Sequence, residues 1–95
     1  MAYHLSLAAA ADIRSIFSEG MRRFGKSQAA KYHLYLESVF ETIAANPRIA
    51  RERPELQPPM RVHSCGSHIV LYLVEASNDV LIVRVRHHRE DWKPR

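Results

Sequence analysis

Most side chains that could take part in acid–base or electrostatic chemistry lie in the C-terminal part of this 95-residue sequence. Histidine exchanges protons near neutral pH, and the arginine guanidinium pairs with phosphate or with developing negative charge. The arginines and histidines that could in principle act together in this way are Arg61, His63, His68, Arg84, His87 and His88. Whether these side chains meet depends on the elements that carry them.

Metal and thiol chemistry find less support in the residue spacing. His87 and His88 are adjacent, and neighbouring strand residues point to opposite faces, so this pair does not predict a metal site. No cysteine or carboxylate at ligand spacing completes a set. Cys65 is the single cysteine, so the chain forms no internal disulfide and we expect a reducing compartment. We therefore expect neither a metal nor a cofactor.

The first helix is predicted from its ends and its apolar spacing. Tyr3–Leu5 should be extended, Ser6 is suited to the N-cap, and Gly25 is suited to the C-cap. Between them, residues at spacings of three and four form one apolar face: Ile13, Ile16, Phe17, Gly20 and Phe24.

A second amphipathic helix follows almost at once. Ser27 is the candidate N-cap, and the helix should end near Asn46, just before Pro47. Its apolar residues repeat at helical spacing: Tyr32, Leu36, Val39, Phe40 and Ile43. Because the joint is short, the two helices should form an antiparallel hairpin with their apolar faces on the same side.

Strand patterns occupy the rest of the chain. The segment from Pro47 to Pro59 holds four of the five prolines and should be an irregular connection. Three strands of an antiparallel meander should follow, over Arg61–Ser64, His68–Ala76 and Val80–His87. The predicted fold class is therefore α+β, in the order β-α-α-β-β-β, with the hairpin on one face of a small, mainly antiparallel sheet. We expect one domain, residues 1–95, with one hydrophobic core.

Strict alternation along the last strand separates its side chains into two sets. Leu81, Val83 and Val85 share one face, and the other face carries Ile82, Arg84 and Arg86. We expect the helices to cover the first set and both arginines to lie on the open face. There they could clamp a carboxylate or phosphate, or simply form a solvated edge.

The overall charge favours a macromolecular partner. The formal net charge is +4, the isoelectric point is near 9.6, and most basic residues are arginines. The N-terminal residues lack a secretory pattern, and no apolar run approaches the roughly 18 residues that a membrane helix needs. We therefore expect a cytoplasmic protein that does not act on membranes.

Four stretches resemble the ParE branch of the ParE/RelE toxin superfamily: LSLAAAADIRSIF, RRFGKSQAAKYHLYLESVFETIAANP, RVHSCGSHIVLYLV and VLIVRVRHHREDW. Together they span nearly the whole chain. Their most specific parts are an FG joint followed by QAxxY, the GSHxVxY segment, and the ending IxRVxHxRxDW. A generic amphipathic pattern does not require these three parts in combination.

The resemblance implies the toxin of a type II toxin–antitoxin pair. Its partner would be a ParD-like antitoxin with a ribbon-helix-helix start and a flexible acidic tail, in a hetero-oligomeric complex. ParE members are associated with poisoning of DNA gyrase, whereas RelE members cut messenger RNA in the ribosome. The leading hypothesis is gyrase inhibition by binding, without a catalytic site of the chain's own.

Two alternatives remain open. In a RelE-like ribosome-dependent endonuclease, the catalytic set would be Arg61, His63, His68, Arg84 and His88. The C-terminal tyrosine of that branch is missing here, and Trp92 offers only an N–H donor in its place. His68 is also explained as a strand-start histidine bonded to neighbouring backbone. The other alternative is a non-toxic homologue that keeps antitoxin binding.

The leading hypothesis assigns two sets of binding residues. The target surface would combine the basic open face with the C-terminal tail: Arg84, Arg86, His88, Arg89, Trp92 and Arg95. Trp92 could instead pack back against the sheet. The antitoxin surface would include Arg14, Arg22, Tyr35 and Arg61. Direct nucleic-acid binding stays undecided.

Overall fold

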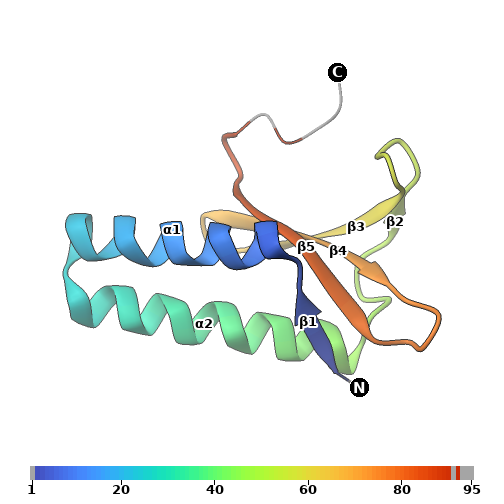
Figure 1. The fold of residues 1–95 in the computed structure, drawn as a ribbon, viewed down its shortest axis with the longest axis horizontal. Helices are drawn as coiled ribbons and strands as arrows, with labels where there is room; N and C mark the ends of the chain where they lie inside the picture. Colours follow the sequence, from blue (N-terminus) through green and yellow to red (C-terminus); the bar gives the residue numbers. More distant parts are fainter. Residues whose placement is uncertain (1, 91, 93–95) are drawn as a thin grey trace.

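The fold is a helical hairpin packed on a five-stranded sheet (Figure 1). The computed structural model describes residues 2–90 and residue 92. The elements follow one another as β1 (Tyr3–Leu5), α1 (Leu7–Phe24), α2 (Lys26–Ala45), β2 (Glu52–Arg53), β3 (Met60–Cys65), β4 (His68–Val74) and β5 (Val80–His87). Strand order in the sheet is β1-β5-β4-β3-β2, with β1 parallel to β5 and the other pairs antiparallel.

The predicted α+β class and meander are confirmed, with one strand added. The proline-rich connection was expected to be irregular throughout, but its residues Glu52 and Arg53 pair with Arg61 and Met60 as β2. Two residues are too few to give a recognisable alternation, so the sequence pattern did not reveal this strand. Among the described residues, no helix is long and apolar enough to cross a membrane.

Ser6 begins α1 as predicted, and it also ties the helix to the sheet. Its hydroxyl accepts a hydrogen bond from Ala9 N at 2.9 Å and donates one to Val83 O at 2.7 Å. Its backbone N–H donates to Ile82 O at 3.0 Å. The N-terminus of α1 therefore continues the hydrogen bonding of β5 beyond the end of β1.

The start of α2 differs from the prediction. Gly25, and not Ser27, is its N-cap, and no side chain caps this end. Gly25 N also donates to Met21 O at 3.1 Å, and Gly25 O accepts from Ala29 N at 3.1 Å. One residue thus ends α1 and begins α2. Its φ of 87° and ψ of 166° lie in a region that is essentially restricted to glycine, which allows so tight a reversal.

A β-bulge in β5 overturns the predicted faces of that strand. Leu71 pairs with Arg84 and the next residue, Tyr72, pairs with Ile82, so Val83 is an extra residue. The extra residue shifts the alternation, and the side chains that join the helix-covered core are Val80, Ile82 and Val85. Leu81 and Val83 were therefore wrongly predicted to face the helices, and Ile82 was wrongly predicted to face away.

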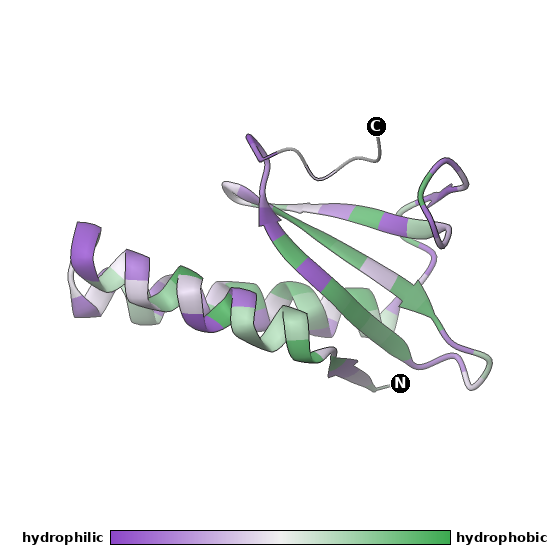
Figure 2. Cartoon of the chain, turned by 45° about the horizontal axis from the view of Figure 1, so that its top comes forward, coloured by the Kyte–Doolittle hydropathy of each residue, from purple (hydrophilic) through white to green (hydrophobic). Residues whose placement is uncertain are grey.

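Two hydrophobic clusters lie on opposite faces of the sheet, in place of the single core expected. The larger one packs α1 and α2 on the sheet through residues such as Phe40, Ile43 and Tyr72. The smaller one joins Leu56, Met60, Ile69 and Leu71, with Val83 and Trp92 partly buried against it. Figure 2 shows that the last two strands are mostly hydrophobic, which suits strands packed on both faces.

Candidate functional site

A groove of about 790 Å³ lies between the hairpin and the end of the sheet. It exists because the buried residues of α1, Ala9 and Ile13, both belong to its first half. The turn between α1 and α2 projects beyond the sheet (Figure 1), so the apolar side chains near it are not covered. Phe24 is 68% exposed and Tyr35 is 45% exposed.

The walls of the groove are aromatic and aliphatic on the helix side and polar on the sheet side. The helices contribute Ile16, Phe17, Phe24, Tyr32 and Tyr35, and the sheet end contributes Ser67, His68 and His87. Arg23, Lys31 and Glu19 also line it, so two formal positive charges face one negative charge. Such a groove suits an amphipathic segment that carries negative charge.

Tyr32 joins the second helix to the sheet end of the groove. Its hydroxyl lies 2.6 Å from His68 Nδ1 and 3.2 Å from Cys65 O. Burial raises the pKa of this hydroxyl, so it stays protonated and able to donate. A Cβ at Gly66 would lie 2.9 Å from the same hydroxyl, and Gly66 has a φ of +60°, so the turn between β3 and β4 needs glycine here.

Three histidine rings gather beside this tyrosine. The His68 and His87 rings meet edge to face with centroids 5.3 Å apart, and those of His87 and His88 stack at 4.7 Å. The expectation that His87 and His88 point to opposite faces was wrong, because β5 ends at His87 and alternation does not extend to the next residue. Burial lowers the pKa of His68, and His87 and His88 act in the same direction.

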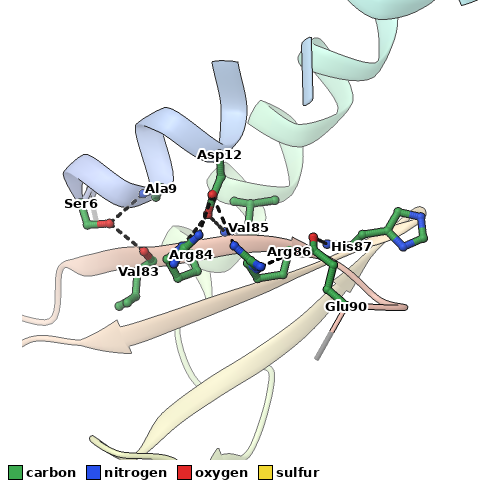
Figure 3. A network of polar contacts seen from close by, with 9 residues as sticks. All are labelled: Ser6, Ala9, Asp12, Val83, Arg84, Val85, Arg86, His87 and Glu90. Atoms are coloured by element: carbon green, nitrogen blue, oxygen red, sulfur yellow. Dashed lines mark hydrogen bonds and ion pairs between the residues drawn. The ribbon is translucent and has the colours of Figure 1, made fainter. Parts of the chain in front are cut away.

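Asp12 organises the neighbouring edge of β5 (Figure 3). Its carboxylate accepts from Arg84 Nε at 2.7 Å, from Arg84 Nη2 at 2.9 Å and from Val85 N at 3.0 Å. Arg86 Nη1 lies 3.9 Å from Asp12 Oδ1. Burial would raise the pKa of Asp12, but these hydrogen bonds and positive charges outweigh it and lower the pKa. The carboxylate that the two arginines clamp is therefore the chain's own.

The described part of the chain offers neither a reactive thiol nor a group of side chains suited to a metal ion. Burial raises the pKa of the Cys65 thiol to about 11, which leaves it protonated and unreactive at neutral pH. Within residues 2–90 and 92, no group of three or more His, Cys, Asp or Glu side chains is placed to hold a metal ion.

Comparison with known proteins decides the family. Residues 3–92 match the family described as ParE toxin of type II toxin-antitoxin system, parDE. This chain belongs to the ParE toxin family. The resemblance noted from the sequence is thereby confirmed, and the chain's function is that of a toxin in a type II toxin–antitoxin system.

Curated relatives and one solved structure agree with this assignment. Toxin ParE1 of Mycobacterium tuberculosis is 39% identical over 89 residues, covering 94% of this chain and 91% of that toxin. Toxin ParE of Escherichia coli is 33% identical over 94 residues, covering 99% and 91%. The structure titled chromosomal ParDE TA system from P. aeruginosa matches with a TM-score of 0.78 at 18% identity, covering 92% of this chain and 95% of that one, which supports the fold.

The residues considered for RelE-like ribonuclease chemistry are not gathered at one place. His68 and His88 belong to the histidine cluster, but Arg61 lies toward the other end of β3 and donates to Ala50 O at 2.6 Å. His63 contacts Ser64 O. Arg84 pairs across the sheet with Leu71 of the second cluster, so it faces away from the helices and bonds Asp12.

The predicted target-binding residues of this ParE-family chain differ in how exposed they are. His88 and Arg89 are exposed. Arg84 and Arg86 lie on the open face as predicted but are engaged by Asp12 and Glu90. Trp92 packs back on the second cluster, where the Arg53 guanidinium lies 5.9 Å from its ring centroid. Arg95 lies outside the described residues.

The predicted antitoxin-binding residues do not form one surface. Tyr35 lines the groove, whereas Arg14 and Arg22 are exposed on α1 without lining it. Arg61 donates a hydrogen bond to Ala50 O, in the connection before β3. Sequence reasoning took Tyr32 as packing only and did not single out Phe24 as a site residue. The combination FG with QAxxY, which contains both, was the signal that could have found them.

Proposed function

We propose that this ParE-family toxin inhibits DNA gyrase by binding it and is held inactive by a ParD-like antitoxin whose acidic segment occupies the groove. The observation that carries the proposal is the family match over residues 3–92. ParE members are associated with gyrase poisoning, and the toxin would meet gyrase in the cytoplasm.

The groove supplies the chemistry for the antitoxin part of this proposal. An amphipathic helix docks by placing apolar side chains on a hydrophobic surface, and exposed Phe24 and Tyr35 offer such a surface. Arg23 and Lys31 at the groove favour an acidic segment over a basic one. A ribbon-helix-helix domain at the other end of the antitoxin would make the complex a hetero-oligomer.

The gyrase contact is proposed for the end of β5 and the tail that follows it. Arg84 and Arg86 are largely neutralised by Asp12 and Glu90, so the exposed His88 and Arg89 are the better candidates for a direct contact. Arg89→Glu should weaken gyrase inhibition without changing stability, because the side chain is exposed. Arg51→Glu, at an exposed position of the connection, is the matched control.

A supercoiling assay with purified gyrase tests the proposal. Toxin freed from its antitoxin should block supercoiling and trap cleaved DNA, and added antitoxin should restore activity. Normal supercoiling without cleaved DNA at excess toxin would remove gyrase as the target.

Primer extension on ribosome-bound message then checks the RelE-like alternative, which requires toxin-dependent cuts. Unimpaired growth of cells that express the toxin alone would favour the non-toxic alternative.

A further inference from the structure

His68 and His87 both line the sheet end of the groove, and each has one ring nitrogen already engaged. Arg89 N donates to His87 Nδ1 at 3.1 Å, which requires a lone pair there and assigns the ring proton to Nε2. At His68, the Tyr32 hydroxyl lies 2.6 Å from Nδ1 and engages that nitrogen as donor or as acceptor. Nε2 of His87 therefore carries an N–H in the neutral ring, and Nε2 of His68 carries one whenever its ring is protonated.

These two donors are available to a ligand. Within residues 2–90 and 92, no protein atom bonds either Nε2, and the one buried side-chain nitrogen or oxygen without a partner is His33 Nδ1. Neither Nε2 atom is therefore fully buried, and a ligand can reach each of them. The rings meet edge to face at 5.3 Å between centroids, so the donors belong to one small area of the groove.

The charged groups around this area favour an anion. From the hairpin, Arg23 and Lys31 face the groove against Glu19, and the other titratable groups there are Tyr32, Tyr35 and His33. From the strands, Cys65 is buried and protonated. Beyond β5, Glu90 is engaged by Arg86 and by His87 N at 2.8 Å, His88 bonds Ser67 O, and Arg89 adds positive charge. No carboxylate in the described residues bonds either imidazole Nε2.

We propose that His68 and His87 form a carboxylate subsite, which receives an aspartate or glutamate side chain of the antitoxin segment in the groove. The inference rests on the proposed antitoxin binding and adds a specific contact to it. Two N–H donors can bind the two oxygens of one carboxylate, and protonation of a ring converts the contact into a charge-assisted pair. The subsite would fix the position of the segment along the groove.

Proton uptake on binding is the distinguishing consequence. A bound carboxylate favours the charged imidazolium, so the complex holds more protons than the separated proteins. Affinity should therefore rise as pH falls from about 8 to about 6, by roughly ten-fold for a shift of about one pKa unit. Loss of both histidine charges should remove this dependence.

Titration calorimetry with the purified cognate antitoxin tests the subsite. Wild-type toxin should bind about ten-fold more tightly at pH 6 than at pH 8. His87→Ala should weaken binding at pH 6 by about ten-fold or more, the range for a hydrogen bond to a charged group. His87→Gln keeps an N–H donor but cannot be protonated, so its affinity should depend less on pH than that of wild type, and the double variant His68→Gln/His87→Gln should bind equally at both pH values.

His4→Gln changes an exposed histidine of β1, whose partner residue in β5 is Leu81, six residues before His87, and it should behave as wild type. His68→Gln repeats the test at the second ring, with thermal unfolding as the fold check.

Wild-type affinity and pH dependence in His87→Ala and His68→Gln would overturn the subsite while leaving antitoxin binding intact. Absence of any binding by wild type would instead remove the proposed function, and the subsite with it. Binding of single-stranded RNA that these variants abolish, with unchanged antitoxin affinity, would assign the histidines to phosphate and also overturn the proposal.

Discussion

Asp12 shows how one side chain can join two distant parts of a small protein. Its carboxylate accepts hydrogen bonds from the Arg84 guanidinium and from the backbone N–H of Val85. Val85 lies beyond the part of β5 that pairs with β1, so this N–H has no strand partner on that side. The Asp12 side chain is only 13% exposed. Removing one member of such a hydrogen-bonded ion pair leaves the other charge poorly solvated, which costs more than a surface pair contributes.

Asp12→Asn should lower the free energy of unfolding by about 2 kcal/mol at pH 7, because a charge-assisted pair becomes neutral on one side. The folded protein lowers the pKa of Asp12, so its contribution is present above the ordinary carboxyl pKa of about 4 and is lost as pH falls through the lower folded value. Urea unfolding of both proteins between pH 2 and pH 7 measures this.

Glu41→Gln is the control for that substitution, since Glu41 is exposed and makes no hydrogen bond or ion pair within the described residues. It should change stability by less than about 0.5 kcal/mol. A difference between wild type and Asp12→Asn that persists unchanged at pH 2 would contradict the role of the ionised carboxylate.

Sequence patterns could not reveal this contact. Asp12 and Arg84 are 72 positions apart, and no local spacing relates a helix residue to a strand so distant. The pair Arg84 and Arg86 did indicate a carboxylate clamp, because alternate strand residues share a face. What the pattern could not distinguish was a carboxylate of a partner from one inside the same chain.

At the scale of elements, the hairpin turn is the sharpest departure from local rules. A Ser27 N-cap would have required a longer joint, but Gly25 alone ends α1 and begins α2. Gly25→Ala should therefore destabilise the protein by about 1–3 kcal/mol, since alanine is strained at a φ of 87° and a ψ of 166°.

Ser27→Ala should have almost no effect on the urea midpoint, because Ser27 lies inside the first turn of α2 and caps nothing. The two variants together distinguish the observed turn from the expected one. Marked destabilisation by Ser27→Ala with a tolerated Gly25→Ala would show that the helix begins at Ser27.

Element types were largely predictable, and strand faces were not. Helical spacing from Ile13 to Phe24 and the cap at Ser6 identified α1, and β5 was predicted with its observed bounds, Val80–His87. The bulge at Val83 has no local signal, since valine is ordinary in any strand. One inserted residue was enough to exchange the two faces of half the strand.

At the scale of the whole molecule, the groove results from a mismatch between the hairpin and the sheet. The helices have 18 and 20 residues, about 27 to 30 Å, and part of that length extends past the strands (Figure 1). The uncovered apolar surface is a cost for the isolated toxin, and under the proposed function it is the surface that the antitoxin covers. Helix spacing predicted the apolar face, but only the three-dimensional packing shows which part of it stays uncovered.

Phe24 provides the most direct test that this groove is the antitoxin site. It is 68% exposed and lines the groove, whereas Leu34 is 65% exposed on α2 and does not line it. Because both side chains are exposed, aspartate at either position should leave the fold intact. Loss of an aromatic anchor costs about 2 kcal/mol or more at an interface, and the added negative charge repels an acidic segment.

The decisive measurement is the dissociation constant of the antitoxin for wild type, Phe24→Asp and Leu34→Asp toxins under identical salt and pH. The groove as binding site predicts affinity at least about thirty-fold weaker for Phe24→Asp and unchanged for Leu34→Asp, with equal thermal stability. Wild-type affinity in Phe24→Asp, or an equal loss in both variants, would contradict the groove as the antitoxin site.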